Sequence, residues 1–576
     1  MSERTTKDRV DVVVVGSGAA GSIVAMTLAK AGIRVVCLEQ GDWWRPEAYP
    51  HTRPDWEWRR LTDWSTAVNV RRKPHDYPVD STDENTLMWA GVGGATQIYT
   101  ATWPRFRPSD FRKGIEHGLA PDWPYTYEDL APYYEATDRL VGVSGWQGDP
   151  AMPPRERPPT RPVAATRMGR VAVRAFERLG WHWWPMPCAI LGEDYDGRPA
   201  CNNCGNCQNG CPRGSMNMAG ITVWPKALAA GAELRTGARV EKVETGPDGR
   251  ATGVVYLDRA SGTRYRQPAD VVVLACNGVG TPRLLLLSAS GKHPNGLANR
   301  SDQVGRNLMH HVLSIVEFWV DEPTDSHAGI ISAAQICAEF AETDPARGFV
   351  NGLTIHVVRQ NGAGFQALGS HSGNTAPWGA AHHDHVRRHF GRSVGLLVVG
   401  DDLPQASNRV TLSETLSDSS GLPAPAIRYR LHENDRRLIR FGIERARDIA
   451  AAADAFDVKV NDFGLSSTGY RPPAWHLLGT ARMGTDPEQS VVDADHRAWD
   501  CPNLYIVDGS NMPSGAAVNP TSTIVAMALR AAERMVASRR DPTVSSRHGR
   551  SAAASSTRPG GGAGRGTGYR QRINLR

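Results

Sequence analysis

The apolar positions near the start of the chain follow two successive patterns. Residues 10–15 (VDVVVV) form an almost continuous apolar run, as expected for a strand buried on both faces. A helical stretch follows and ends at Gly32, a typical residue just beyond a helix, and residues 33–38 form a second apolar run. This order predicts a strand, a helix and a parallel strand, which together begin an α/β domain.

A glycine-rich turn connects the first predicted strand to the helix. Gly16, Gly18 and Gly21 form the pattern G-x-G-x-x-G in a strand–turn–helix context. The first glycine permits a tight turn, the second lets the backbone approach a pyrophosphate, and the third lets helix and strand pack closely. Ala19 and Ala20 then begin the helix, where unpaired N–H groups favour a phosphate. We therefore predict a dinucleotide-binding site.

An acidic residue ends the second predicted strand. Glu39, followed by Gln40, is placed to accept hydrogen bonds from ribose hydroxyls. An acid at this position disfavours a 2′-phosphate and hence NADP. The motif by itself does not separate FAD from NAD.

Four cysteines lie close together in the middle of the chain. Cys201, Cys204, Cys207 and Cys211 have the spacing C-x2-C-x2-C-x3-C-P of bacterial ferredoxins, whose thiolates hold iron–sulfur clusters. The sequence contains no second run of this kind, although two-cluster ferredoxins need one. We expect a loop without metal. An iron–sulfur cluster is the first alternative, and zinc or disulfides follow.

Four further segments carry a resemblance to a known family. Residues 88–111 contain GGAT followed by W-x-RF-x-P-x-DF, and the later motifs HLLGT, VDGS and NPTST occur in that order. Together with the N-terminal turn, they resemble the glucose–methanol–choline (GMC) oxidoreductases over residues 10–535. The pattern is most similar to the branch of gluconate and glucose dehydrogenase flavoproteins and pyranose or glycoside oxidases. Tyr99 is a departure, because the family usually has Asn there.

The resemblance implies an α/β fold with two domains and FAD as the cofactor. We expect a Rossmann-like FAD-binding domain at 8–310 and 471–538, with inserted cap segments at about 45–90 and 110–220. A substrate domain built on a β-sheet with helices is expected at 311–470. The cofactor-binding residues implied by motif and resemblance are Gly16, Gly18, Ala19, Ala20, Gly21, Glu39, Gln40, Gly93, Gly94, Thr96, Val240, Asn277, Asp508, Gly509, Asn519, Pro520 and Thr521.

The resemblance also implies a catalytic pair. His476 would accept the alcohol proton while Asn519 hydrogen-bonds the same oxygen, and the carbon-bound hydrogen would pass as hydride to flavin N5. We further expect Asn519 to cap a helix that starts at Pro520, and its N-terminus to face the isoalloxazine. His310 and His311, in the segment VGRNLMHH, are expected to be structural.

The expected reaction is oxidation of an alcohol hydroxyl to a carbonyl, on a sugar or glycoside. The alternative is a dehydrogenase subunit that relays electrons through a cysteine-bound iron–sulfur cluster to a partner. The sequence does not decide whether the electron acceptor is oxygen, a quinone or a redox protein. Flavin monooxygenases and amine oxidases share the N-terminal turn but lack the pairing of His476 with Asn519. We expect the WHWW cluster at 181–184 to pack in the core.

Composition and charge limit the kinds of partner that we expect for this protein. Hydrophobic residues at 40% and charged residues at 22% fit a globular protein, and no apolar run approaches the ~18 residues of a membrane span. The whole chain has a net charge of +6. Residues 539–576 hold nine Arg and one Asp, a net charge of +8, so the rest of the chain has a net charge of −2. We expect a disordered basic tail at 539–576, no nucleic-acid partner and, from the polar N-terminus, a cytoplasmic protein.

Overall fold

The structure is a computed structural model that describes residues 4–5, 8–73, 75–118, 120–332, 335–359, 362–368, 376–465, 471 and 473–540. The chain divides into a compact unit that ends at Glu533 and a second unit that begins at Arg534. Almost all of the predicted basic tail, from residue 541 onward, lies outside the described residues. The two sheets described next belong to the first unit.

The larger sheet contains the predicted N-terminal strands. Its path is β6-β3-β2-β9-β8-β7, and β1 and β18 also pair with β9. The strands are β1 (Arg4–Thr5), β2 (Val10–Val15), β3 (Val35–Leu38), β6 (Glu233–Arg235), β7 (Ala238–Thr245), β8 (Ala251–Asp258), β9 (Thr263–Leu274) and β18 (Leu504–Ile506). Helix α1 (Ala19–Lys30) connects β2 to β3, so the predicted strand–helix–strand order is confirmed.

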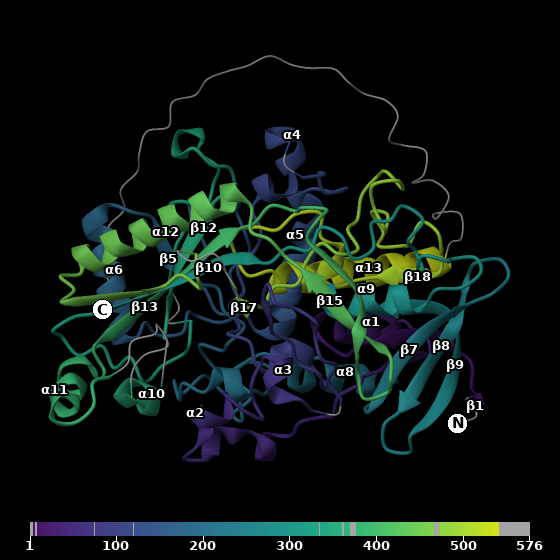
Figure 1. The fold of residues 1–576 in the computed structure, drawn as a ribbon, viewed down its shortest axis with the longest axis horizontal. Coiled ribbons are helices and arrows are strands. Elements are labelled where there is room, and N and C mark those ends of the chain that lie inside the picture. The colour runs from purple at the N-terminus through teal and green to yellow at the C-terminus, as the bar shows by residue number, and fades with distance from the viewer. Residues whose placement is uncertain are drawn as a thin grey trace. The chain divides into compact units, whose positions relative to one another are not determined.

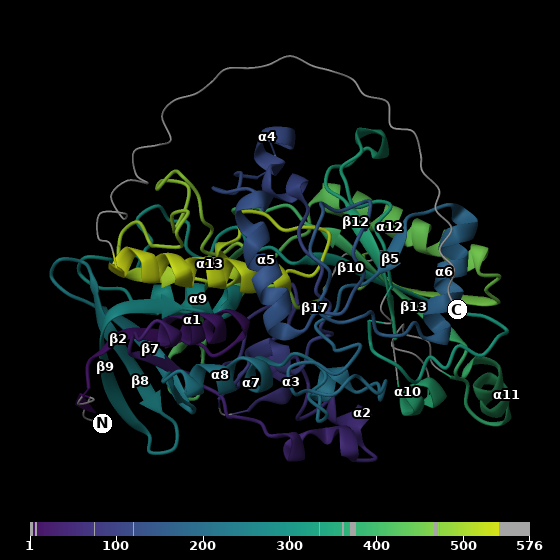
Figure 2. The same ribbon diagram turned by 180° about the vertical axis from the view of Figure 1, so that it is seen from behind.

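The long strand β9 joins a parallel half to an antiparallel half of this sheet. Its first part, from Thr263 to Pro268, pairs antiparallel with β8. Its second part, from Ala269 to Leu274, pairs parallel with β2, and its last three residues pair with β18. Strands β7, β8 and β9 stand side by side in both views (Figure 1 and Figure 2). The carboxyl ends of β2, β3, β9 and β18 therefore share one edge, where parallel sheets bind ligands.

The smaller sheet is antiparallel, with the order β16-β10-β13-β12-β11-β5. Its strands are β5 (Trp183–Pro185), β10 (His311–Trp319), β11 (Gln335–Cys337), β12 (Leu353–Val358), β13 (Ser393–Asp401) and β16 (Asp457–Asn461). Helices α6 (Arg167–Leu179) and α12 (Glu433–Ala452) pack on one face. The division into an FAD domain and a substrate domain stays a prediction. Strand β10 begins at His311, where the substrate domain is expected to start, but the sheet also contains β5, which belongs to the segment 110–220.

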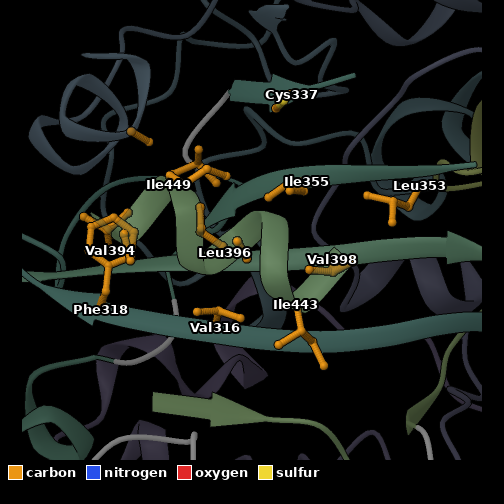
Figure 3. Close-up of a cluster of buried hydrophobic side chains, with 14 of the residues drawn as sticks. Val316, Phe318, Cys337, Leu353, Ile355, Val394, Leu396, Val398, Ile443 and Ile449 are labelled. Carbon is orange, nitrogen blue, oxygen red and sulfur yellow. The ribbon is translucent and has the colours of Figure 1, made fainter. Parts of the chain in front are cut away.

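Alternation along the strands of the smaller sheet separates a core face from a second face. Val316, Leu396 and Ile355 point into the core with Ile443 and Ile449 of α12 (Figure 3). Trp181 and Trp183 pack against the same cluster, as expected for the WHWW segment. Because side chains alternate along a strand, the opposite face carries a different set of residues, namely His311, Leu313, Thr354, His356 and Leu397.

The remaining elements are shorter or lie outside the sheets. They are α2 (Trp56–Arg59), α3 (Val68–Arg71), α4 (Lys113–His117), α5 (Tyr127–Val141), α7 (Ala219–Thr222), α8 (Trp224–Ala229), α9 (Asn277–Leu287), α10 (Ala363–Leu368), α11 (Ala380–His389), α13 (Thr521–Arg540), β4 (Asn85–Thr86), β14 (Arg409–Ser417), β15 (Pro423–Arg428) and β17 (Pro473–Ala474). Within the described ranges, no helix has the length and apolar character that crossing a membrane requires.

Candidate active site

One cavity brings together residues from both ends of the chain. Its wall includes the turn after β2, the end of β3, the start of α9 and the segments around His476 and Asn519. The predicted site residues that line it are Gly16, Gly18, Ala19, Ala20, Glu39, Gln40, Gly94, Thr96, Val240, His476, Asn277, Asp508, Gly509, Asn519, Pro520 and Thr521. Gly21 and Gly93 are not among the lining residues.

The two glycine-rich segments touch each other at the cavity wall. Gly94 has a φ of +53°, and a Cβ there would lie 2.9 Å from the Cα of Gly18. Gly93 donates its N–H to the carbonyl of Ser17 at 3.2 Å, which joins the second segment to the first. Helix α1 starts after Gly18 with no side-chain cap and no acid in its first turn. Its first N–H groups are therefore available to an anionic ligand such as a pyrophosphate.

Glu39 is held by the turn that it faces. Its Oε2 accepts hydrogen bonds from the N–H and hydroxyl of Ser17, at 3.0 and 2.7 Å, and its Oε1 accepts the N–H of Gly41 at 2.8 Å. Burial raises the pKa of the Glu39 carboxyl, and the hydrogen bonds from Gly41 and Ser17 oppose that rise. The sequence motif did not reveal Ser17 as the residue that orients this acid.

Asp508 connects the ends of two neighbouring parallel strands. Its Oδ2 accepts the N–H of Asn277 at 2.9 Å and the hydroxyl of Thr281 at 2.6 Å, and its Oδ1 accepts the N–H of Ser510 at 2.9 Å. Asn277 has a φ of +70° and its side-chain oxygen accepts the N–H of Val279 at 2.9 Å, so it begins α9. Their contacts to a flavin remain predictions.

His476 and Asn519 meet at the cavity wall. The Nδ2 of Asn519 lies 3.2 Å from the Nε2 of His476, although the residues are 43 positions apart. The Oδ1 of Asn519 is buried and has no hydrogen-bond partner among the described residues. Helix α13 begins at Thr521, one residue later than predicted, and the expectation that Asn519 caps it is wrong. The amide instead faces His476, where both groups are within reach of one small polar ligand.

A second histidine, His311, contacts the ring of His476. The Nδ1 atoms of His311 and His476 are 2.8 Å apart, and the Nε2 of His311 lies 2.6 Å from the carbonyl oxygen of Ala516. Burial lowers the pKa of His311 to about 4. Burial, and then the neighbouring His311, also lower the pKa of His476 well below its usual range. Both rings are therefore neutral at neutral pH, and the expectation of a purely structural His311 misses this contact.

His310 contacts a different set of buried side chains, and its structural role stays a prediction. Its ring pairs with the buried Glu84 and lies against Tyr429, with ring centroids 4.6 Å apart. His310 directly precedes β10, and adjacent residues of extended backbone point to opposite sides, so only one of the two histidines can reach His476. The sequence HH contains no signal that tells them apart.

The cavity wall also contains apolar and polar side chains that the sequence did not identify. Leu313, Leu397 and Trp475 contribute apolar surface, and Arg60 and Gln208 contribute hydrogen-bonding groups. A guanidinium N–H of Arg60 donates to the side-chain oxygen of Gln208. A pocket of this kind, mostly apolar with a few convergent polar groups, suits a small molecule with several oxygens.

Gln208 belongs to the cysteine-rich loop. Cys204 is exposed and Cys207 is buried, and burial raises the pKa of the Cys207 thiol to about 12 and that of Cys201 to about 11. Over the described ranges, no three His, Cys, Asp or Glu side chains are grouped so that they could hold a metal ion, and these four cysteines are included. The arrangement does not favour the alternative of an electron relay through a cluster.

Comparisons with known proteins identify the family of this chain. Two models described as GMC oxidoreductase match residues 10–313 and 404–528. The chain is 46% identical to 2-methyl-1,2-propanediol dehydrogenase of Mycolicibacterium austroafricanum, over 92% of this chain and 95% of that protein. It is 30% identical to the fructose dehydrogenase large subunit of Gluconobacter japonicus, over 91% and 97%. A solved structure of a formate oxidase variant from Aspergillus oryzae shares the fold, with a TM-score of 0.64, 18% identity and coverage of 94% and 100%.

Proposed function

The chain belongs to the GMC oxidoreductase family, and on this basis we propose that it oxidises an alcohol hydroxyl to a carbonyl with FAD as its cofactor. The single observation that carries the proposal is the pairing of His476 with Asn519 on the wall of the cavity that the dinucleotide motif also lines. The relatives support it, because they are named as dehydrogenases of a diol and of a sugar.

The residues present fit the proposed cofactor. The uncapped start of α1 offers N–H groups for the pyrophosphate, and Glu39 has lone pairs left for a ribose. Gly94 lines the same cavity, and its lack of a side chain lets this second glycine-rich segment lie directly against Gly18. Pro520 and Thr521 bring the start of α13 to the same cavity, where its dipole would favour negative charge.

The proposed chemistry assigns one task to each member of the pair. The alcohol oxygen accepts a hydrogen bond from the Nδ2 of Asn519 and donates its proton to the Nε2 of His476. Loss of that proton strengthens the expulsion of hydride from the carbon, and bound FAD supplies the hydride acceptor. The neutral state of His476 makes its lone pair available at neutral pH.

The proposal is tested by purifying the full chain and screening substrates without oxygen. We expect a flavin absorbance spectrum, and bleaching of that spectrum by at least one sugar, glycoside, polyol or small diol. A flavin that dithionite reduces but that no alcohol in the panel reduces would contradict the proposal.

The pH dependence of flavin reduction follows from the lowered pKa of His476. The base form is the neutral ring, and the pKa lies well below 6.5, so the ring stays neutral as the pH falls to and below that value. We expect the rate constant of flavin reduction to be constant from about pH 6.5 to 9 and to fall only in more acidic solution. Anaerobic stopped-flow measurements at constant ionic strength check this. A rate that rises through pH 7 to 8 would show that the base is not the ring described.

We propose a sugar or another polyol as the substrate, because Arg60 and Gln208 add hydrogen-bonding groups to an otherwise apolar wall. Arg60→Ala removes a charged donor, so we expect the KM for a polyol to rise by roughly ten-fold or more. The KM for a simple monohydric alcohol should change little. Arg387→Ala on α11, where the side chain is 77% exposed, is the matched control. Equal changes for both kinds of substrate would contradict a role of Arg60 in selection.

A further inference from the structure

His311 contacts His476 through atoms that reveal which ring nitrogen of each residue carries a proton. A carbonyl oxygen can only accept, so the 2.6 Å contact with Ala516 requires a proton on the Nε2 of His311. A neutral ring carries one N–H, and the Nδ1 of His311 is therefore an acceptor. The 2.8 Å contact between the two Nδ1 atoms then requires that the Nδ1 of His476 carries the proton.

The remaining nitrogen of His476 is the one that faces Asn519. With its proton on Nδ1, the neutral ring has its lone pair on Nε2. That atom lies 3.2 Å from the amide nitrogen of Asn519, which can donate to it. We propose that His311 is a positioning residue, which keeps the proton of His476 on Nδ1 and the Nε2 lone pair toward the substrate oxygen. This inference rests on the proposed function of His476 as the base.

Side chains from the second face of the smaller sheet and from α4 hold the backbone beside His311 and Asn519. Three successive carbonyls in the segment before Asn519 each accept a hydrogen bond from a buried side chain. Lys113 donates to Gly515 at 2.9 Å, His311 to Ala516 at 2.6 Å, and Thr354 to Ala517 at 2.6 Å. The hydroxyl of Thr354 in turn lies 2.9 Å from the Nε2 of His356. The ring of His311 therefore has one fixed orientation, because it is held at both nitrogens.

The charged and titratable groups around His311 and His476 cannot take over the positioning role of His311. The groups that act on His311 are Lys113 and His310, and those that act on His476 are His311, His310 and His356. All of these side chains disfavour a positive charge on the two rings, whereas the backbone of Ala516 and Val518 favours one on His311. The Nδ1 of His311 is therefore the group that stabilises a protonated His476. It stays hydrogen-bonded to the Nδ1 of His476 when the alcohol proton arrives on the Nε2 of His476. This is the role that a carboxylate has in other catalytic triads.

Two variants of similar size separate the two hydrogen bonds of His311. His311→Asn places a carbonyl oxygen near the former Nδ1 and keeps an acceptor for His476. His311→Gln places an amide N–H near the former Nε2 and keeps the donor to Ala516, but it offers no acceptor to His476. We expect flavin reduction to slow by about 100-fold in His311→Gln, with substrate affinity unchanged, and by less than about ten-fold in His311→Asn. Flavin content and melting temperature, measured for both variants, identify loss of folding.

A second readout needs no substrate and tests the proton positions themselves. The holoenzyme is labelled with 15N-histidine, and the signals of His476 are assigned by comparison with His476→Gln. We expect the Nδ1 of His476 to have the 15N chemical shift of a protonated nitrogen and its Nε2 that of an unprotonated nitrogen. His311→Gln should move this population toward a proton on Nε2. The inference is overturned by the opposite tautomer in the unmodified protein, by equal slowing in the two variants with FAD retained, or by no slowing in either. If no alcohol reduces the flavin, the proposed function fails while the nitrogen shifts still test the role of His311.

Discussion

Replacing His476 by alanine should abolish reduction of the flavin by an alcohol while FAD stays bound. His476 contributes its Nε2 to the wall beside Asn519, and it is not part of the glycine turns or of the hydrogen bonds around Glu39. The variant therefore loses the proton acceptor without losing the groups that would bind the cofactor. General-base catalysis contributes a factor of roughly 100 to 10,000, so the rate constant should fall by at least that much.

The measurement is anaerobic stopped-flow reduction with the best substrate, and flavin content is measured on the same samples. His383→Ala, an exposed histidine on α11, is the control and should match the unmodified protein. Near-normal flavin reduction in His476→Ala would refute the role assigned to this residue.

Replacing Gly21 by valine should prevent FAD from binding. A Cβ at this position would lie 2.0 Å from the carbonyl oxygen of Gly16 and 3.1 Å from its carbonyl carbon. Neither atom belongs to a flexible side chain, so α1 must move away from the turn that it packs against. The turn and the start of α1 form the proposed pyrophosphate site, and their separation would remove it. We expect protein that contains less than about a tenth of the flavin of the unmodified chain, because crowding of this kind costs 1–3 kcal/mol or more.

Flavin content per chain is measured from absorbance, and far-UV circular dichroism separates loss of cofactor from loss of fold. Gly291→Ala is the control, because a Cβ there meets no atom within 4 Å. If Gly21→Val does not fold, Glu39→Gln tests the same site with less disturbance, since it removes one hydrogen-bond acceptor. Full flavin content in both variants would contradict the proposed location of the cofactor.

Part of the fold could be predicted from short stretches of sequence. Strand β2, helix α1 and strand β3 depend on the apolar pattern of neighbouring residues and on glycine at Gly16, Gly18 and Gly32. These are local properties, because the steric freedom of glycine and the burial of a strand are set within a few residues. The same stretch predicted Glu39 at the cavity, and the family resemblance brought His476 and Asn519 together as candidates.

The environment of the catalytic pair depends instead on contacts between distant residues. His311 and His476 are 165 positions apart, and Arg60 and Gln208 are 148 positions apart. The face on which His311 lies depends on the register of β10 against β13, where His311 pairs with Asp401. A shift of one residue would bring His310 to that face, and no local pattern distinguishes the two.

The sequence by itself thus determined the glycine turn and the acid after the second strand, and its resemblance to a family supplied the two candidate catalytic residues. Only the tertiary structure decided that Asn519 faces His476 instead of capping α13, that His311 stands behind His476, and that Gln208 of the cysteine loop lines the cavity. The physical reason is the range of the interactions. A turn or a strand is selected by its own residues, whereas a hydrogen bond between side chains depends on where the sheets place them.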